Sequence, residues 1–365
     1  MNDEKNKECC SSSCCESSSP NGYGYAAGMI TTVVGNIVRI NSLNTFKDKF
    51  EHFKCRVSSF RNEYKIEPKL YALGNPDADS DVFVSANYKY SFDHLRRDLS
   101  GLNCWILAIN TNGINVWCAA GKGTFGTGRV ALAIKKSRLT EIVSHKKIIL
   151  PQLGAVGVSA HEIKKQTGFT VVYGPVYSKD IKNFINSGYT ANEEMRSIKF
   201  PFNERVKIAP LELIPALKPF LWAALIVMVI TGITGTGIIF SQMYEFGLPL
   251  IILGFIAILC GTVLVPILLP FLPFKSFAVK GMILGFIPSI IAIFSIPSVV
   301  LIVFSWIVFP AVSSYYSLLL TGSTTFTSPS GVEKELRKAI PLYFIALAAA
   351  IICLVLYKLI HFGIL

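Results

Sequence analysis

Two hydrophobic patterns divide the chain at Pro219. Before this residue, short apolar segments alternate with charged amphipathic ones, and after it come five long apolar runs. The runs cover residues 219–240, 248–272, 281–296, 298–320 and 341–357. Because about twenty apolar residues cross the hydrocarbon core of a bilayer, we expect five membrane-spanning helices. The third run is short and should borrow Phe277–Lys280, and four spans with one broken helix are the alternative.

The part before Pro219 predicts strands and helices in alternation. Apolar segments indicate strands at 81–86, 102–109, 147–150 and 169–173, after an extended segment at 67–76. Amphipathic segments indicate helices at 45–65, 91–99, 129–136, 159–166 and 179–186, with Ser91 as the N-cap of the second. Such alternation is typical of an α/β fold with a parallel sheet. We therefore expect a Rossmann-like α/β domain followed by an all-α transmembrane domain.

Composition suggests how these elements are divided into domains. Residues 1–44 are predicted to be a disordered Cys/Ser-rich tail and lead-in, and residues 45–200 the α/β domain. Residues 201–218 contain three prolines and are predicted to be a linker. Residues 219–361 would form the transmembrane domain of about five helices, in which Gly281 and Gly285 favour close helix packing.

Basic residues determine the expected orientation. The first 218 residues contain 29 Lys and Arg against 20 Asp and Glu, which suits anionic membrane lipids or an acidic protein partner. The pattern does not suggest a nucleic-acid surface, because basic residues and aromatics do not alternate along one stripe. Basic residues precede the first span and occupy every second loop after it. We expect a multi-pass protein of the cell (inner) membrane with a cytoplasmic N-terminal domain and its C-terminus outside.

The nine cysteines do not form the pattern of a secreted disulfide framework. Four of them lie together in the tail, as Cys9, Cys10, Cys14 and Cys15. Thiolates are soft ligands, so this group suits capture of a soft metal ion. A flexible tail with incidental cysteines is the alternative.

One further thiol lies in the segment Asn115–Lys122, which reads NVWCAAGK. Asn115 is a suitable N-cap and places Cys118 in the first turn of a helix, where the helix dipole favours a thiolate. The small residues that follow leave room for a large flat ligand. The simpler interpretation is that Cys118 is a small buried hydrophobic residue. The glycines of Gly121–Gly126 match the pattern of a dinucleotide-binding loop only weakly. They lie well past the preceding strand, and no acidic residue ends the next predicted strand.

Residues 115–127 (NVWCAAGKGTFGT) closely resemble the cap helix of the mercury-methylation corrinoid protein family, HgcA. Further blocks at 67–76, 84–95, 149–164 and 168–181 are also similar, as is the order of a soluble domain before five spans. The resemblance implies a base-off, cobalamin-type corrinoid with the Cys118 thiolate as lower axial ligand to cobalt. It implies a methyltransferase that transfers a methyl group from methyl-Co(III) corrinoid to Hg(II) and forms methylmercury.

The same resemblance implies partners and further site residues. The partners would be a companion ferredoxin with two [4Fe–4S] clusters as reductant, and a methyl-donating folate/corrinoid protein system. The implied cofactor-binding residues are Ser85, Ser91, Asn115, Val116, Trp117, Cys118, Ala119, Gly121 and Lys122. Ser85 and Ser91 stand where the family commonly has Thr, and the hydroxyl is kept. Lys122 either contacts a corrin side chain or is a solvated helix end.

Two other functions stay open from the sequence. One is a membrane-anchored corrinoid methyl carrier of the acetyl-CoA-pathway type that acts on another acceptor. The soluble carriers of that type share the SANYK-type block but lack a membrane region, contain an iron–sulfur motif and do not place Cys at the cap position. The other is a membrane scaffold or channel with a ligand-sensing domain. The apolar runs contain no charged residue, which favours anchoring over ion-coupled transport.

Overall fold

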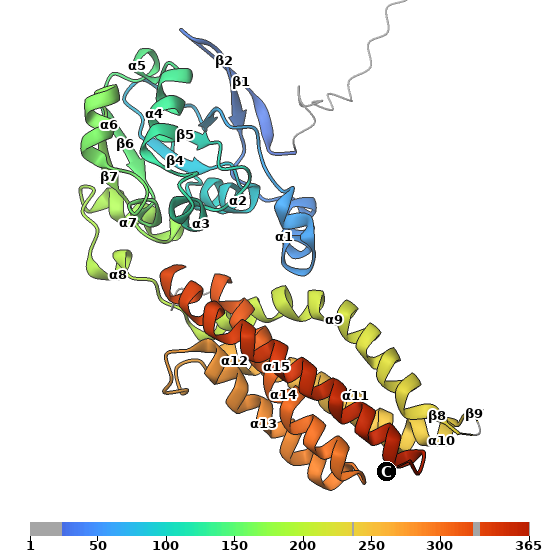
Figure 1. Cartoon of the computed structure of the whole chain (residues 1–365). Helices are drawn as coiled ribbons and strands as arrows, with labels where there is room; N and C mark the ends of the chain where they lie inside the picture. The colour runs from blue at the N-terminus through green and yellow to red at the C-terminus, as the bar shows by residue number, and fades with distance from the viewer. Residues whose placement is uncertain (1–23, 236, 324–328, 365) are drawn as a thin grey trace, which may run out of the picture. The chain divides into compact units, whose positions relative to one another are not determined.

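A computed structural model describes residues 24–235, 237–323 and 329–364 (Figure 1). The chain divides into two compact units. The sheet unit comprises the described residues up to Lys49 and residues 64–196, and the helix unit comprises residues 50–63 and those from 197 onward. A mixed α/β sheet followed by five apolar helices confirms the predicted fold class.

Seven strands form the sheet in the order β1-β2-β3-β5-β4-β6-β7. Their bounds are β1 Ala26–Thr32, β2 Gly35–Ile40, β3 Leu70–Leu73, β4 Val82–Ala86, β5 Cys104–Ile109, β6 Lys147–Leu150 and β7 Thr170–Tyr173. Within the run β5-β4-β6-β7 each strand is parallel to the next, whereas β3 is antiparallel to β5. The predicted parallel sheet is therefore confirmed for its central and C-terminal strands.

Helices cover both faces of this sheet. They are α2 Lys89–Asp98, α3 Val116–Gly121, α4 Thr127–Lys136, α5 Leu139–Ile142, α6 Ala160–Thr167, α7 Ile181–Asn186 and α8 Glu193–Arg196. Side chains of a strand alternate between its two faces. In β5, Trp105 and Leu107 pack in a core with residues of α4 and α6, whereas Ile106 packs in a second core with residues of α2 and α7. Both faces are thus apolar, which explains the continuous hydrophobic run in this strand.

Residues 26–40, which were predicted to lie in the disordered lead-in, instead form the strands β1 and β2. The two strands pair antiparallel through a turn at Val33 and Val34. In β1, exposed and half-buried residues alternate, so this edge strand buries few large side chains. Its hydrophobic signal is weak for that reason, and the prediction missed it.

The predicted N-cap at Ser91 is also wrong. Helix α2 begins at Lys89, and its N-cap residue is Tyr88, which makes no side-chain capping bond. Ser91 therefore lies inside the first turn. Lys89, at the start of the helix, is held by the buried carboxylates of Asp93 and of Asp48, and Asp48 is 41 residues away in the sequence.

The helix unit contains five helices that are long and apolar enough to cross a membrane, as predicted, among the residues the structure describes. They are Phe202–Gly232 (α9), Phe240–Leu268, Phe277–Ser295 (α13), Val299–Leu319 (α14) and Gly331–His361 within α15 (Pro329–His361). The second combines α10 Phe240–Gln242, α11 Leu248–Leu259 and α12 Val265–Leu268 with π-helical turns at Met243–Gly247 and Cys260–Leu264. The third begins at Phe277, as predicted. A short hairpin of β8 (Ile233–Thr234) and β9 (Gly237–Ile238) follows α9.

Residues 201–218 do not form an irregular linker. They are helical almost throughout, because α9 begins at Phe202 and contains Pro210, Pro215 and Pro219 within it. A proline removes one backbone hydrogen bond and usually bends a helix rather than abolishing it when the flanking residues are strong helix formers. Of the three prolines that suggested a linker, Pro201 is the N-cap residue of α9 and Pro210 and Pro215 lie inside it, so they did not mark an irregular segment.

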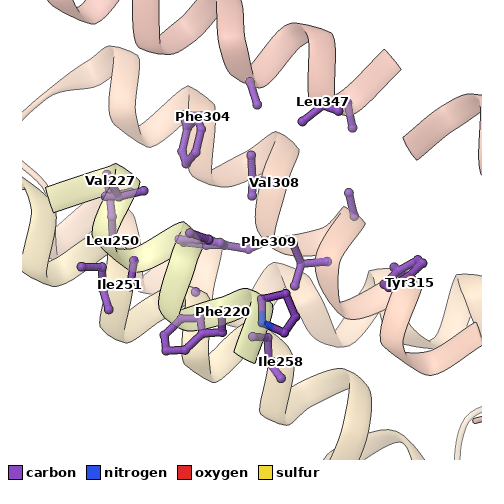
Figure 2. Close-up of a pocket in the computed structure, with 18 of the residues that line it drawn as sticks. Phe220, Val227, Leu250, Ile251, Ile258, Phe304, Val308, Phe309, Tyr315 and Leu347 are labelled. Atoms are coloured by element: carbon purple, nitrogen blue, oxygen red, sulfur yellow. The ribbon is translucent and has the colours of Figure 1, made fainter. Parts of the chain in front are cut away.

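Small residues bring α13 and α14 together, as the two glycines predicted. A Cβ atom added at Gly281 would lie 2.5 Å from the backbone oxygen of Ser313. One added at Gly285 would lie 2.6 Å from the Cα of Pro310. A cavity of about 460 Å³ elsewhere in this unit is lined by apolar and aromatic residues of α9, α11, α14 and α15 (Figure 2).

Candidate functional site

The site is built where the parallel strands β4 and β5 end. Asn87 follows β4 directly, and its side chain is buried. Its side-chain oxygen accepts hydrogen bonds from the backbone N–H of Thr111 at 2.9 Å and of Gly113 at 3.1 Å. Its amide nitrogen donates to the backbone oxygen of Ile66 at 3.1 Å. One buried amide thus fixes the loop that leads from β5 to α3.

This loop turns sharply before α3. Asn112 and Gly113 both have positive φ angles, of 60° and 77°. Gly and Asn are the residues that adopt this conformation most readily. The hydroxyl of Thr111 donates to the backbone oxygen of Ile114 at 2.6 Å and closes the turn. The loop geometry therefore determines where α3 begins.

The predicted N-cap of α3 is confirmed. The side-chain oxygen of Asn115 accepts a hydrogen bond of 2.8 Å from the backbone N–H of Cys118. This contact satisfies one of the free N–H groups at the helix start and fixes the first turn. Cys118, whose backbone N–H makes this contact, also carries the candidate thiol.

The residues of α3 divide between a buried face and an accessible one. Val116, Ala119 and Ala120 belong to the core beneath the helix. Trp117 and Cys118 are half-buried, and Gly121 and Lys122 are exposed. The core contacts anchor α3, and the accessible face carries the thiol.

The loop after β6 packs closely against α3 because of two glycines. A Cβ atom added at Gly157 would clash with the backbone oxygen of Phe125 and lie 3.1 Å from the Cα of Ala120. One added at Gly154 would lie 2.7 Å from the ring of Phe125, which is fully buried. The glycine pair was not identified from the sequence, although its spacing within LGAVGV is a signal that could have revealed it.

Cys118 differs from the other cysteines of the described part. Cys55, Cys104, Cys260 and Cys353 are buried, whereas Cys118 is half-buried. Burial and the nearby Asp81 raise the pKa of the Cys104 thiol to about 12, which keeps it protonated. The described residues contain no group of three or more His, Cys, Asp or Glu that could hold a metal ion. Among the described cysteines, Cys118 is thus the one whose side chain is not buried.

The remaining predicted residues lie in different places. Ser85 is buried within β4, beside Ala108 of β5, whereas Ser91 is half-buried in α2. The four tail cysteines lie outside the described residues. The structure therefore brings the residues 115–122 together and supports them from Asn87 and Gly157, which the sequence did not single out.

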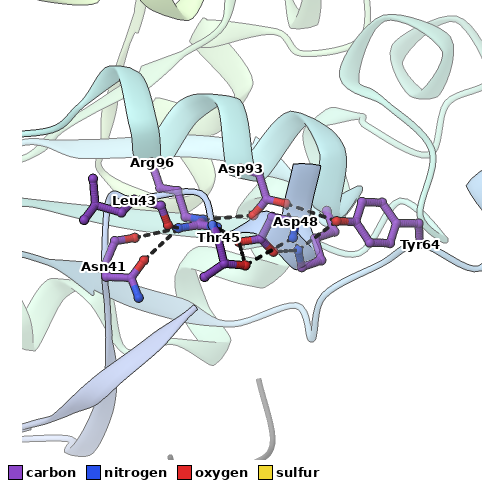
Figure 3. Close-up of polar contacts among 8 residues, drawn as sticks. Asn41, Leu43, Thr45, Asp48, Tyr64, Asp93 and Arg96 are labelled. Carbon is purple, nitrogen blue, oxygen red and sulfur yellow. Dashed lines mark hydrogen bonds and ion pairs between the residues drawn. The ribbon is translucent and has the colours of Figure 1, made fainter. Parts of the chain in front are cut away.

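A buried ionic network fixes α2 near this site (Figure 3). Arg96 is fully buried and forms ion pairs of 2.9 Å with Asp93 and with Asp48. Lys89 binds the same two carboxylates, at 2.8 Å and 2.6 Å. Burial by itself would raise the pKa of Asp48, but hydrogen bonds from Lys89 and Thr45 hold it at about 2. The spacing of Lys89, Asp93 and Arg96 on one helix face could have indicated the network.

Comparison with known proteins shows that this region is similar to subunits of acetyl-CoA-related complexes. Residues 58–185 match the family model described as CO dehydrogenase/acetyl-CoA synthase delta subunit. The gamma subunit of the acetyl-CoA decarbonylase/synthase complex of Archaeoglobus fulgidus is 30% identical over 135 residues, which are 36% of this chain and 28% of that protein. A gamma 1 subunit of Methanosarcina mazei is 28% identical over 169 residues, or 45% of this chain and 36% of that protein.

The match is limited to part of both proteins. The chain spans about a third of the length of these relatives. The matched residues include β3 to α7 and hence the whole of α3 and its supporting loops. The five apolar helices lie outside the family match. What is similar is therefore the sheet-bearing region with the candidate site.

Proposed function

We propose that this protein is a corrinoid-dependent methyltransferase and that Cys118 is the lower axial ligand to the cobalt. The observation that carries the proposal is the half-exposed thiol in the first turn of α3, whose backbone is held by Asn115. The similarity of residues 58–185 to subunits of acetyl-CoA decarbonylase/synthase complexes supports methyl-group chemistry. A bound corrinoid would supply a cobalt that accepts and donates a methyl group.

The accessible part of the site suits a large flat cofactor. A Cβ atom added at Gly121 or at Gly123 would meet no other atom within 4 Å, so the surface beyond the thiol is open. Trp117 and Lys122 flank the thiol along the helix and would contact the ring and its polar side chains. Ser85 of β4 and Ser91 of α2 stay proposed contacts. The residues present therefore fit a base-off corrinoid whose lower position is taken by a protein ligand.

The chain itself would control the polarity of methyl transfer. Hg(II) is an electrophile, so the methyl group must leave with its bonding electron pair. A thiolate at Cys118 donates electron density to the metal and favours that polarity, as axial ligands generally tune a cofactor. The N-cap contact from Asn115 keeps the thiol in one position and reduces the reorganisation needed for ligation. We therefore propose Hg(II) as the methyl acceptor and methylmercury as the product.

The proposal includes partners and a location. A companion ferredoxin with two [4Fe–4S] clusters would return the cobalt to its reduced state, and a folate/corrinoid protein system would supply the methyl group. The relatives are named as subunits of a complex, which supports dependence on partner proteins. The five apolar helices support a multi-pass location in the cell membrane. The loop charges support a cytoplasmic sheet unit and an external C-terminus.

The test uses the full-length protein, purified without oxygen and reconstituted with a corrinoid. Wild-type protein should bind cobalt in an amount equal to the amount of protein. The absorption spectrum of the bound corrinoid should differ between wild-type protein and Cys118→Ala. With a labelled methyl donor, reduced ferredoxin and Hg(II), it should form labelled methylmercury. A cobalt-free protein, or a spectrum that does not change in Cys118→Ala, would contradict the proposed ligand.

A methyl carrier with another acceptor is the second candidate, because the known relatives belong to acetyl-CoA decarbonylase/synthase complexes. The same preparation distinguishes the two. Protein that takes up a labelled methyl group in a Cys118-dependent manner but gives no methylmercury with Hg(II) would favour this carrier. Labelled methylmercury would favour mercury methylation.

A further inference from the structure

Helix α1 (Phe46–Val57) has an unusual distribution of side chains. Three large aromatic residues are exposed, with Phe46 at 85%, Phe50 at 59% and Phe53 at 61%. On the same helix Asp48 and Cys55 are buried, at 4% and 3%. A helix of a soluble domain normally shows the opposite arrangement. Within the part of the chain that the structure describes, nothing covers these three phenylalanines.

The exposed residues form one continuous stripe. Successive residues of an α-helix are rotated by about 100°, so residues spaced by four and three lie on the same side. Phe46, Phe50 and Phe53 have this spacing and lie opposite Asp48. Leu43 precedes Phe46 by three positions, and its side chain is 75% exposed. The stripe is thus apolar from the start of the helix through its second and third turns.

The buried ionic network fixes the rotation of the helix. Asp48 accepts hydrogen bonds from Lys89 at 2.6 Å and from Arg96 at 2.9 Å. It also accepts one from the backbone N–H of Thr45 at 2.9 Å, at the start of the helix. Rotating the helix to bury its phenylalanines would expose Asp48 and leave Arg96 without this carboxylate, which costs several kcal/mol. The aromatic stripe is therefore held outward by charges on the inner side.

Basic side chains flank the stripe on both sides. By the same helical spacing, Lys49 lies along one border of the phenylalanines, and Lys47 and Lys54 lie along the other. Lys47, Lys49 and Lys54 are exposed. A cationic border beside an aromatic face is typical of helices that lie in the interface of a membrane, where long lysine side chains reach the headgroups.

Residues 50–63 form part of the same compact unit as the five long apolar helices. In that unit Arg61, just beyond α1, interacts electrostatically with Glu212 of α9. Glu212 lies in the charged first half of α9, before the apolar residues that follow Pro219. The segment that follows α1 is therefore within electrostatic range of a helix that is itself suited to enter a bilayer.

We propose that α1 is an interfacial membrane helix, whose phenylalanines insert below the headgroups while its lysines bind anionic lipid. The occupant of the exposed stripe is thus the membrane surface, not a second protein. Since Asp48 is tied to α2, binding of α1 to lipid would also restrict the motion of the sheet unit. This inference does not depend on the identity of the cofactor or of the methyl acceptor.

The test places a photoreactive amino acid, p-benzoylphenylalanine, at Phe50 or at Phe53 in the full-length protein. The protein is reconstituted in nanodiscs of phosphatidylcholine with or without phosphatidylglycerol, illuminated and analysed by mass spectrometry. We expect lipid adducts at both positions. The matched control is Val33, an exposed apolar residue (76%) on the β1–β2 turn, where the lipid adduct should be at least tenfold weaker.

A charge variant tests the role of the lysines. Replacing Lys47, Lys49 and Lys54 together with Gln should reduce adduct formation at Phe50 several-fold in nanodiscs that contain phosphatidylglycerol, and much less in phosphatidylcholine alone. The experiment is repeated in native membranes, where adducts with a protein at Phe50 and Phe53 in place of lipid would overturn the proposal in favour of a protein partner. Lipid adducts at Val33 equal to those at Phe50 would overturn it as well.

Discussion

The sheet unit and the helix unit bury their polar groups in different ways. In the sheet unit, Asp93 and Arg96 are fully buried and paired at 2.9 Å. In the helix unit the buried polar groups are mostly hydroxyls, and Ser317 of α14, for example, donates to the backbone oxygen of Phe277 in α13 at 2.7 Å. Ion pairs require fixed geometry, whereas a hydroxyl on a helix is satisfied by many carbonyl groups. The comparison indicates that the sheet unit is built for a precise site and the helix unit for helix packing.

The strongest test of this difference compares two cysteines. Cys118→Ala should reduce methyl transfer by at least about a thousandfold, or ~4 kcal/mol, because the cobalt loses its protein ligand. Cys260→Ala, in the helix unit, should leave the rate within about twofold, because its buried thiol serves packing. Rates are measured with labelled methyl donor at equal cobalt content. Equal losses in both variants would remove the distinction between the units.

The second test breaks the buried network. Asp93→Asn removes the carboxylate that binds both Lys89 and Arg96, and we expect a local loss of about 3 kcal/mol. Hydrogen exchange of the α2 amides in the full-length protein measures this loss. Glu141→Gln is the control, because its ion pair with Arg138 is exposed and should contribute less than about 0.5 kcal/mol. A difference of less than 1 kcal/mol between the variants would show that the network is not needed for rigidity.

The third test uses pH. The pKa of Asp48 is about 2 in the folded protein against an ordinary value of 3.8, so its contribution to stability is complete above about pH 4. The contribution, about 2 kcal/mol, is lost as the pH falls from 4 to 2. Hydrogen exchange of α1 and α2 at these pH values should show the loss in wild-type protein. Asp48→Asn should be less stable at pH 6 and lack this component, and an unchanged acid profile in that variant would contradict the assignment.

The smallest effect is expected in the helix unit. Ser317→Ala removes one hydrogen bond between α14 and α13 and should cost about 1 kcal/mol or less. Ser313→Ala is the control in the same helix, since its buried hydroxyl has no hydrogen-bond partner in the part of the chain that the structure describes. Unfolding in mild detergent compares the two. A cost of several kcal/mol for Ser317→Ala would mean that hydroxyl bonds contribute more here than packing of the small residues.

Much of the fold was predictable because its signals are local. The continuous apolar run of β5 and the amphipathic pattern of α4 and α6 identify these elements within a few residues. The contact of Asn115 with the backbone of Cys118 was predictable for the same reason, since the two residues are three apart. The five apolar helices followed from their length and composition.

The errors have a common physical cause. The strands β1 and β2 are stabilised mainly by pairing with each other and, through β2, with β3, which no single segment reveals. The start of α2 depends on carboxylates of α1 and of α2 itself. In the site, Asn87 accepts hydrogen bonds from Thr111 and Gly113, which follow it by 24 and 26 positions. Gly157 must lack a side chain because the backbone of Phe125 lies too close. These contacts exist only after the chain has folded.

By itself, the sequence determined the alternation of strands and helices, the apolar helices and the placement of a thiol in a helix's first turn. Each of these depends on periodicity, length or a capping contact within a few residues. Only the tertiary structure decided that Cys118 stays half-exposed above a buried face of α3, and that α1 turns its phenylalanines outward. Both depend on long-range contacts, a close-packed core beneath α3 and buried ion pairs at Asp48, which constrain rotation and burial in ways that local patterns do not.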